Sequence, residues 1–343
     1  MSTTPYFFRG EQAVPLGSLI FPKRGASILL NKVRILVHDA FMDTNLMTLT
    51  PKGAMDSEYL YYALTHIQLW RIADTTSIPQ INNKHITPLV LPRPPVAEQR
   101  AIATALSDID ALLAKLDAFI AKKRDLKQAA MQQLLTGQTR LPGFSGEWEV
   151  KRVGQFADCT SGGTPSTSIP RYWGGSVRWM SSGELNLKTV AEVEGRITEE
   201  GLRNSSTRMV PAKCVLIGLA GQGKTRGTVA MNLIELCTNQ SIAAILPNPA
   251  FVPEYLYYNL DARYDELRGL STGDGGRGGL NLTIIRSLSV PFPAIQEQTA
   301  IATILSDMDT ELAALEARRD KTRALKQGMM QELLTGRIRL LAS

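Results

Sequence analysis

The chain is poor in the side chains that most enzymes use for nucleophilic or metal-dependent chemistry. It has three cysteines, which lie far apart, and three histidines among 343 residues. No Cys-x-x-Cys pair occurs, which excludes a disulfide scaffold and a cysteine-bound zinc site and favours a cytoplasmic protein. No run of about 18 apolar residues occurs either, so we expect no membrane-spanning helix. The N-terminal residues lack the basic-then-apolar pattern of a secretory signal.

Composition and charge leave a soluble multidomain protein as the expectation. The hydrophobic fraction of 44% excludes a wholly disordered chain, and the length indicates two or three domains. Lysine and arginine number 38 against 32 acidic residues, which gives a net charge of +6. This balance permits a polyanionic partner without requiring one.

The main organising feature is an internal repeat. Residues 91–141 align without a gap with residues 290–340, at an offset of 199, and 29 of the 51 aligned residues are identical. Upstream the match continues more weakly at an offset of 196, where Glu-Tyr-Leu-Tyr-Tyr occurs at 58–62 and at 254–258. A period near 200 residues is too long for a solenoid repeat. The chain therefore carries two copies of a unit that combines a globular domain with a helix.

Each strongly repeated segment predicts one long helix. Prolines precede it, apolar residues follow at heptad spacing, and Leu-Leu-Thr-Gly at 134–137 and 333–336 ends it, with the glycine as a left-handed cap. About 38 residues would make a rod of roughly 57 Å, which cannot bury its apolar stripe alone. We expect the two helices to pair antiparallel as a coiled-coil spacer, and the alternative is a core helix of a larger domain. The expected pairing residues are Ile102, Ile109, Leu116, Ile301, Met308 and Leu315.

The rest of the chain predicts mixed α/β domains. Short apolar runs between turn residues predict strands at 177–180, 214–217, 228–231 and 242–246, and a short helix follows at 253–260. A glycine-rich loop at 270–281 would let the backbone approach a ligand closely. The expected fold class is α+β, with mixed domains separated by two long antiparallel helices and an internal two-fold repeat.

Two segments match the residue patterns of catalytic motifs but lack the flanking elements that those motifs need. Residues 218–225 fit the phosphate-binding pattern Gly-x-x-x-x-Gly-Lys-Thr, yet the next residues, Arg-Gly-Thr-Val, make a poor helix start. Residues 248–251, Asn-Pro-Ala-Phe, approach the tetrapeptide of amino-methyltransferases, but the second proline is missing and no glycine-rich cofactor loop lies upstream. We interpret both as turns.

The remaining polar residues have chemistry suited to binding DNA. Arginine and lysine match the two acceptors of guanine, and asparagine or glutamine matches the donor–acceptor edge of adenine. Candidate contacts in the second copy are Arg178, Ser182, Lys188, Gln222, Lys224, Arg226, Asn239, Gln240 and Arg277. Candidates in the first copy are Asn82 and Lys84, together with Lys32, Arg34, Gln80 and Asn83.

These features together resemble the DNA specificity subunit of type I restriction–modification systems. The resemblance rests on the Pro-x-Pro and Glu-Gln residues of 92–99 and 291–298, the heptad helix and the Leu-Leu-Thr-Gly close. Residues 215–242 look like the core of a target recognition domain, and Phe144, Trp148 and Val153-Gly154 look like its opening.

The resemblance implies a subunit that reads DNA and supplies no catalysis of its own. Two target recognition domains would each read one half of a bipartite site in double-stranded DNA. The helices would dock modification subunits, expected to be two, which bind S-adenosylmethionine. Restriction and translocation subunits would bind ATP and Mg²⁺, and this chain would hold no cofactor. The domains implied are a first recognition domain at 1–90, a spacer helix at 91–140, a second recognition domain at 141–289 and a second spacer helix at 290–343.

One departure from the family pattern concerns the first domain, which has no counterpart of residues 144–196. We therefore expect that residues 1–90 do not read a full half-site. Two other functions remain open at this point. One is an adenine methyltransferase that uses residues 248–251, and the other is a coiled-coil adaptor without DNA contact.

Overall fold

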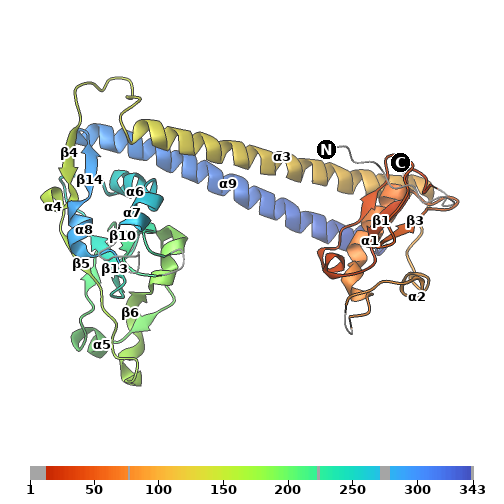
Figure 1. Ribbon diagram of the computed structural model, residues 1–343, viewed down its shortest axis with the longest axis horizontal. Helices are drawn as coiled ribbons and strands as arrows, with labels where there is room; N and C mark the ends of the chain where they lie inside the picture. The colour runs from red at the N-terminus through yellow and green to blue at the C-terminus, as the bar shows by residue number, and fades with distance from the viewer. Residues whose placement is uncertain (1–12, 76–77, 222–224, 271–278, 341–343) are drawn as a thin grey trace. The chain divides into compact units, whose positions relative to one another are not determined.

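The structure is a computed structural model that describes residues 13–75, 78–221, 225–270 and 279–340. The chain forms two compact units, of which unit 1 comprises 1–120 with 314–343 and unit 2 comprises 121–313. The two long helices, α3 (Val96–Leu134) and α9 (Ile295–Leu333), each contribute residues to both units (Figure 1). Each unit is described by itself below.

Unit 1 is built on an antiparallel sheet in the order β2-β1-β3. Leu19 and Phe21 alternate with less buried residues along β1, and α1 packs Leu60 and Leu64 on the same core. The buried tyrosines of α1 belong to a second cluster that includes Ile102 of α3. Asp56 caps α1, because its carboxylate accepts from the backbone N–H groups of Glu58 and Tyr59, both at 3.0 Å. The elements are β1 (Leu19–Pro22), η1 (Ala26–Leu30), β2 (Arg34–Ile35), β3 (Leu46–Leu49), α1 (Ser57–Ile67), η2 (Leu69–Arg71) and α2 (Asn83–Ile86).

Unit 2 has a mixed five-stranded sheet in the order β5-β13-β10-β11-β7 and a second sheet in the order β8-β6-β12-β9. A two-stranded ribbon, β14-β4, lies before α9 in the chain. The strands are β4 (Glu149–Arg152), β5 (Cys159–Ser161), β6 (Trp173–Met180), β7 (Thr189–Val190), β8 (Arg196–Ile197), β9 (Met209–Val210), β10 (Val215–Gly218), β11 (Val229–Asn232), β12 (Leu236–Thr238), β13 (Ile242–Ile245) and β14 (Ser289–Phe292). The helices are α4 (Val153–Phe156), η3 (Pro170–Tyr172), η4 (Ser182–Leu187), α5 (Glu199–Arg203), α6 (Pro253–Asp261), α7 (Tyr264–Gly269) and α8 (Leu282–Ser287).

The apolar runs of the sequence form the central strands of unit 2. The expected strands at 177–180, 214–217, 228–231 and 242–246 correspond to β6, β10, β11 and β13, and the expected helix at 253–260 is α6. All residues of β10, β11 and β13 are buried, because the sheet has side chains packed on both faces. The fold class is α+β, as the sequence predicts.

The repeat extends to the strand register. Leu19 pairs with Ile35 and Leu49 in unit 1, and the residues 196 positions later, Val215 with Met231 and Ile245, pair in the same way in unit 2. The order β2-β1-β3 therefore corresponds to β11-β10-β13, and α1 corresponds to α6. The weak upstream similarity marks a common structural core.

Helices α3 and α9 run antiparallel within each unit. In unit 1, Lys326 donates to Asp110 at 2.6 Å, and in unit 2, Lys123 donates to Glu311 at 2.9 Å. Each helix ends before a glycine in the left-handed region, Gly137 at φ +74° and Gly336 at φ +75°, which confirms the expected caps.

The three cysteines are buried and form no disulfide. Of the helices in the described part of the chain, none is both long and apolar enough to span a membrane. Within the same ranges, no three His, Cys, Asp or Glu side chains gather in a way that could hold a metal ion.

Candidate DNA-recognition surface

Three turns of unit 2 meet at one end of β10. The backbone N–H of Leu219, after β10, donates to Ser241 O at 2.7 Å in the turn between β12 and β13. The N–H of Asn239 donates to Met180 O at 3.0 Å at the end of β6, which runs parallel to β12. We call the described residues of these turns the rim: 181–182, 219–221, 225–228 and 239–241.

Glycines bring a fourth segment against the rim. A Cβ atom on Gly162 would lie 1.9 Å from the Thr238 carbonyl oxygen, so only glycine fits there. This close approach places Thr164 beside the turn, where its hydroxyl donates to the Gln240 side-chain oxygen at 2.6 Å. The rim is thus held by backbone and side-chain hydrogen bonds between segments distant in sequence.

Four of the sequence-predicted contact residues lie in the rim. Ser182 begins η4, and Arg226 lies between β10 and β11. The Asn239 side chain accepts from the Ser241 N–H at 3.1 Å, so it also shapes the turn, and Gln240 is exposed. A turn that presents amide, hydroxyl and guanidinium groups can offer both donors and acceptors to base edges.

The other candidates of unit 2 are not gathered there. Lys188 binds Asp261 at 2.6 Å, and Arg178 on β6 lies 3.5 Å from a carboxylate oxygen of Glu192. Gln222, Lys224 and Arg277 lie outside the described residues, as does most of the glycine-rich loop 270–281.

In unit 1 most of the sequence-predicted contact residues lie at or near the start of α2. Asn82 occupies the N-cap position of α2, and its backbone N–H donates to His85 Nδ1 at 3.1 Å. Asn82, Lys84, Asn83, Lys32 and Arg34 are exposed, and Gln80 is half-buried. Asn281, 199 positions after Asn82, caps α8 in unit 2. These candidates therefore lie in the repeated core rather than in an added domain.

The structure does not give residues 218–225 the context of a phosphate-binding loop. The element that follows β10 is β11, and the two strands pair antiparallel. A phosphate-binding loop needs a helix N-terminus at this point. The described residues of the segment lie between two paired strands, in keeping with the poor helix start in the sequence.

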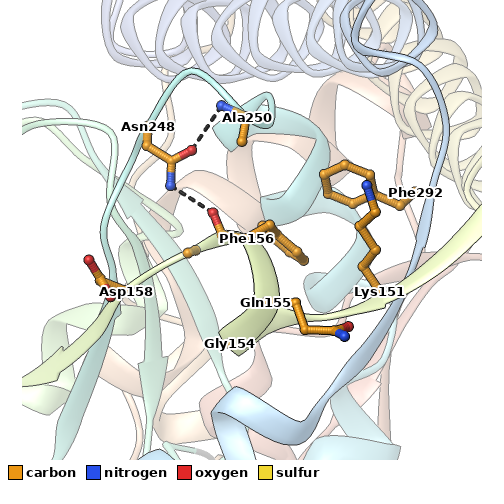
Figure 2. Close-up of a pocket in the computed structure, with 9 residues that line it drawn as sticks. Lys151, Gly154, Gln155, Phe156, Asp158, Asn248, Ala250 and Phe292 are labelled. Carbon is orange, nitrogen blue, oxygen red and sulfur yellow. Dashed lines mark hydrogen bonds between the residues drawn. The ribbon is translucent and has the colours of Figure 1, made fainter.

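Asn248 belongs to a turn between β13 and α6. Figure 2 shows its side-chain oxygen accepting from the Ala250 N–H at 2.8 Å and its side-chain nitrogen donating to the Phe156 carbonyl at 2.8 Å. A cavity of about 490 Å³ lies beside it, lined in part by Lys151 and Phe292. Because its amide bonds to Ala250 within the turn and to Phe156 at the end of α4, Asn248 has a structural role, which does not favour a methyltransferase site.

The paired helices carry a polar cluster that the apolar pattern did not reveal. In unit 1, Tyr62 Oη donates to Asp110 at 2.9 Å, and Lys326 donates to the other oxygen of that carboxylate. In unit 2, Tyr258 Oη donates to Asp309 at 2.8 Å, and Lys127 donates to its other oxygen. The same residue types occur at equivalent positions in both copies, and this was the feature of the sequence that could have indicated the cluster.

The expected pairing residues lie along the same helices. Ile102, Leu116 and Ile301 are buried, and Ile109, Met308 and Leu315 are half-buried. Ile102 shares a core cluster with Met330 and Leu333, and Ile301 shares one with Leu134. In each unit the start of one helix therefore packs near the end of the other.

Comparison with known families agrees with this architecture. The family model for the type I restriction modification DNA specificity domain matches residues 17–122 and 145–323. The chain belongs to this family. The two matched segments coincide with the two copies of the repeat.

Curated relatives carry the same family name. The specificity subunit of the type I restriction enzyme MjaIX of Methanocaldococcus jannaschii is 30% identical over 48% of this chain and 38% of its own length. The specificity subunit of EcoR124I/EcoR124II of Escherichia coli is 28% identical over 64% of this chain and 54% of its own length. The aligned part of the chain thus spans about half or less of these relatives.

Solved structures show the same fold. The S subunit of a type I restriction–modification system from M. genitalium has a TM-score of 0.63 at 17% identity, and the match covers 94% of this chain and 84% of that one. The HsdS subunit from Thermoanaerobacter tengcongensis has a TM-score of 0.52 at 18% identity, covering 95% and 82%.

Proposed function

We propose that this chain is the specificity subunit of a type I restriction–modification complex. It recognises the DNA target sequence and carries out no catalysis itself. The observation that carries the proposal is the match of the specificity-domain family over both copies of the repeat. The curated relatives are also named as specificity subunits of type I restriction enzymes, which supports the proposal.

The rim of unit 2 is the main reading surface in this proposal. Ser182, Arg226, Asn239 and Gln240 would contact base edges there, while Lys188 and Arg178 would set the register through phosphate contacts. Gln222 and Lys224 lie between rim residues in sequence, and Arg277 belongs to the glycine-rich loop 270–281. Asn82 and Lys84 would make the corresponding contacts from unit 1.

The partners proposed are double-stranded DNA, two modification subunits and the restriction and translocation subunits. The modification subunits would dock on α3 and α9 and would bind S-adenosylmethionine. The restriction subunits would bind ATP and Mg²⁺. The assembled complex would act in the cytoplasm, where the target DNA lies. The proposed domains are recognition at 1–90 and 141–289 and spacer helices at 91–140 and 290–343.

The deciding experiment is a map of methylated adenines. The chain is expressed with its modification subunit, and methylation is read at single-base resolution. An asymmetric two-part motif means that both units read DNA, and an interrupted palindrome means that two copies assemble and read through unit 2 alone. A stable complex that methylates no sequence-defined site contradicts the proposal.

A triple variant tests where the reading surface lies. Lys224→Ala, Arg226→Ala and Arg277→Ala together should abolish sequence-specific methylation while the complex still assembles. Lys213→Ala is the matched control, because Lys213 precedes β10 and so lies at the opposite end of that strand from the rim. Unchanged methylation in the triple variant would refute this assignment of the surface.

A further inference from the structure

The loop between β5 and β6 of unit 2, residues 162–169, begins against the rim. Gly163 makes this approach possible, because a Cβ atom there would lie 2.5 Å from the backbone nitrogen of Thr207. The next residue, Thr164, donates to the Gln240 side chain at 2.6 Å. The loop therefore starts beside a residue that the proposed function assigns to a base contact.

Two tryptophans of β6 hold the backbone of this loop. The Trp179 indole N–H donates to the Gly163 carbonyl oxygen at 2.9 Å. The Trp173 indole N–H donates to the Ser166 carbonyl oxygen at 3.2 Å. The two indole rings meet edge to face, with their centroids 5.1 Å apart. Both hydrogen bonds end on main-chain oxygens, so the tryptophans fix the course of the loop without occupying its side chains.

The far end of the loop is also held through its backbone. Thr198, the N-cap of α5, donates through its hydroxyl to the Arg171 carbonyl oxygen at 2.9 Å. Its backbone N–H donates to the Tyr172 carbonyl oxygen, also at 2.9 Å. The Arg171 guanidinium donates to Glu200 at 2.8 Å, so its charge is paired within the unit. Main-chain contacts thus hold the loop at both ends.

The exposed part of the loop carries three consecutive hydroxyl groups, those of Ser166, Thr167 and Ser168, which we call the tip. The Ser166 and Ser168 hydroxyls form a hydrogen bond of 2.8 Å. Residues 159–170 include no Lys, Arg, Asp or Glu. A hydroxyl group both donates and accepts, and the threonine methyl group can contact the methyl group of thymine. Since the tip is uncharged, it neutralises no phosphate, and its chemistry favours contact with base edges.

We propose that the tip, residues 166–168, is a second base-reading element of unit 2 and that Trp173 and Trp179 are its positioning residues. This inference rests on the proposed function, because it adds a contact to the same recognition surface. A loop whose main chain is already fixed loses little conformational entropy on binding. The tip begins two residues after Thr164, which spans at most about 7 Å. Since base pairs rise by about 3.4 Å, the tip reads within about three base pairs of the Gln240 contact.

The test compares the methylation maps of the assembled complex with and without the hydroxyl groups of the tip. Thr167→Val keeps the volume of the side chain, and Ser166→Ala and Ser168→Ala remove the other two hydroxyls; all three changes are also combined. We expect the combined variant to accept a second base at one position of the target, within about three base pairs of the position that Gln240→Ala relaxes. The preference for the original base there should decrease roughly tenfold in DNA binding, and all other positions of the target should be kept.

A tryptophan variant tests the positioning role. Trp173→Phe keeps an aromatic ring but removes the donor to the Ser166 carbonyl, so it should reduce the same base preference while the affinity for a scrambled duplex and the salt slope stay unchanged. Trp148→Phe is the matched control, because the Trp148 indole N–H donates to Glu297 at 3.0 Å, at the start of α9 and not in the loop. The control should keep the preference. Equal loss of preference in the two variants would show a general structural effect and overturn the positioning role.

The wild-type map separates this inference from the proposed function. If the wild-type complex methylates a defined sequence and the combined variant methylates the same sequence with the same preference, the tip reads no base and this inference alone is overturned. If the combined variant binds target and scrambled duplexes equally more weakly, the hydroxyls contact the DNA backbone, which also overturns it. A wild-type complex without sequence-defined methylation overturns the proposed function together with this inference.

Discussion

The carboxylate of Asp110 joins helix α3 to Lys326 of α9, with 2.6 Å between Oδ1 and Nζ. Its other oxygen accepts from Tyr62 Oη, and the Lys326 ammonium lies 5.4 Å from the centroid of the Tyr62 ring. Burial and the Asp110 charge both raise the pKa of Tyr62, so the phenol stays protonated as the donor. The same three residue types meet at Asp309 in unit 2.

Tyr62→Phe should therefore lower the free energy of unfolding of unit 1 by about 1 kcal/mol, because a half-buried carboxylate loses one donor. The measurement is urea unfolding followed by hydrogen exchange of the α1 amides. Tyr258→Phe should act equally on unit 2 and leave unit 1 unchanged. An unaltered unfolding midpoint for unit 1 would mean that the hydroxyl contributes nothing.

Asp110 and Lys326 should also be coupled in a double-mutant cycle. Asp110→Asn and Lys326→Met, made singly and together, should give a coupling free energy of about 0.5–1 kcal/mol. The value is modest because the Asp110 side chain is 38% exposed and water screens the pair. Strictly additive effects would contradict a direct interaction.

Gly137 and Gly336 occupy equivalent positions in the two copies of the repeat. Comparing substitutions at the two positions therefore measures the effect of the Trp148 contact at Gly137. Both have φ near +75°, so alanine at either position costs about 1 kcal/mol of backbone strain. Only at Gly137 would the new methyl group also meet an indole, at 3.2 Å. Gly137→Ala should therefore destabilise its unit more than Gly336→Ala does.

The two glycine variants are compared by hydrogen exchange around each helix end. Gly137→Ala should raise exchange at 145–152 as Trp148 is displaced, and Gly336→Ala should change exchange only next to its own position. Equal effects in the two variants would show that the Trp148 ring adjusts without cost.

The cysteine thiols should be unreactive in the folded protein. Burial raises the pKa of Cys214 to about 12 and those of Cys159 and Cys237 to about 11. Since the thiolate is the nucleophile, iodoacetamide at about pH 8 should label none of the three until the chain unfolds. Mass spectrometry of native and denatured samples checks this, and rapid labelling of the native chain would disprove it.

The raised pKa values of the three thiols also determine how the stability of the folded chain changes with pH. Each folded pKa lies above the ordinary value of 9.0, so the unfolded chain loses its thiol protons first as pH rises. The contribution of the thiols is complete below pH 9.0 and decreases between pH 9.0 and about 12. Cys214→Ala should reduce this alkaline loss of stability.

The sequence predicted the parts of the fold whose signal is local. β10 and β13 are short apolar runs, and α3 and α9 show a heptad pattern with glycine ends, so each could be recognised from its own residues. β4 and β5 carry no such signal, because they are short, polar and defined by pairing with strands far along the chain. The duplication alone did not predict these pairings. That β1 pairs with β3 as β10 pairs with β13 became visible only once the strand register was known.

The candidate surface shows the same limit. Asn239 and Gln240 stood out as polar residues in a turn, but their position beside Met180 depends on the parallel pairing of β6 with β12. Thr164 was missed because its contact with Gln240 spans 76 residues. The role of Trp148 was likewise invisible, since Glu297 lies 149 residues away.

The proposed base contacts and phosphate contacts of unit 2 should differ in how they depend on salt concentration. Gln240→Ala removes an uncharged group, so it should weaken the binding of target DNA relative to nontarget DNA by about 1–3 kcal/mol. The slope of log K against log salt should stay unchanged. Lys188→Ala removes a proposed phosphate contact, so it should instead reduce the slope of log K against log salt by about 0.9 and weaken target and nontarget DNA alike. Lys213→Ala, away from the rim, should change neither quantity.

The measurement is DNA affinity of the assembled complex over a range of KCl concentrations, with target and scrambled duplexes. Gln240→Ala should lose preference for the target because the glutamine amide no longer meets a base edge, and Thr164→Val should have a smaller effect in the same direction because Thr164 orients that side chain. If the Gln240 variant lost affinity equally for both duplexes, Gln240 would contact the DNA backbone and not a base edge. An unchanged preference would place the base contacts elsewhere than in the turn between β12 and β13.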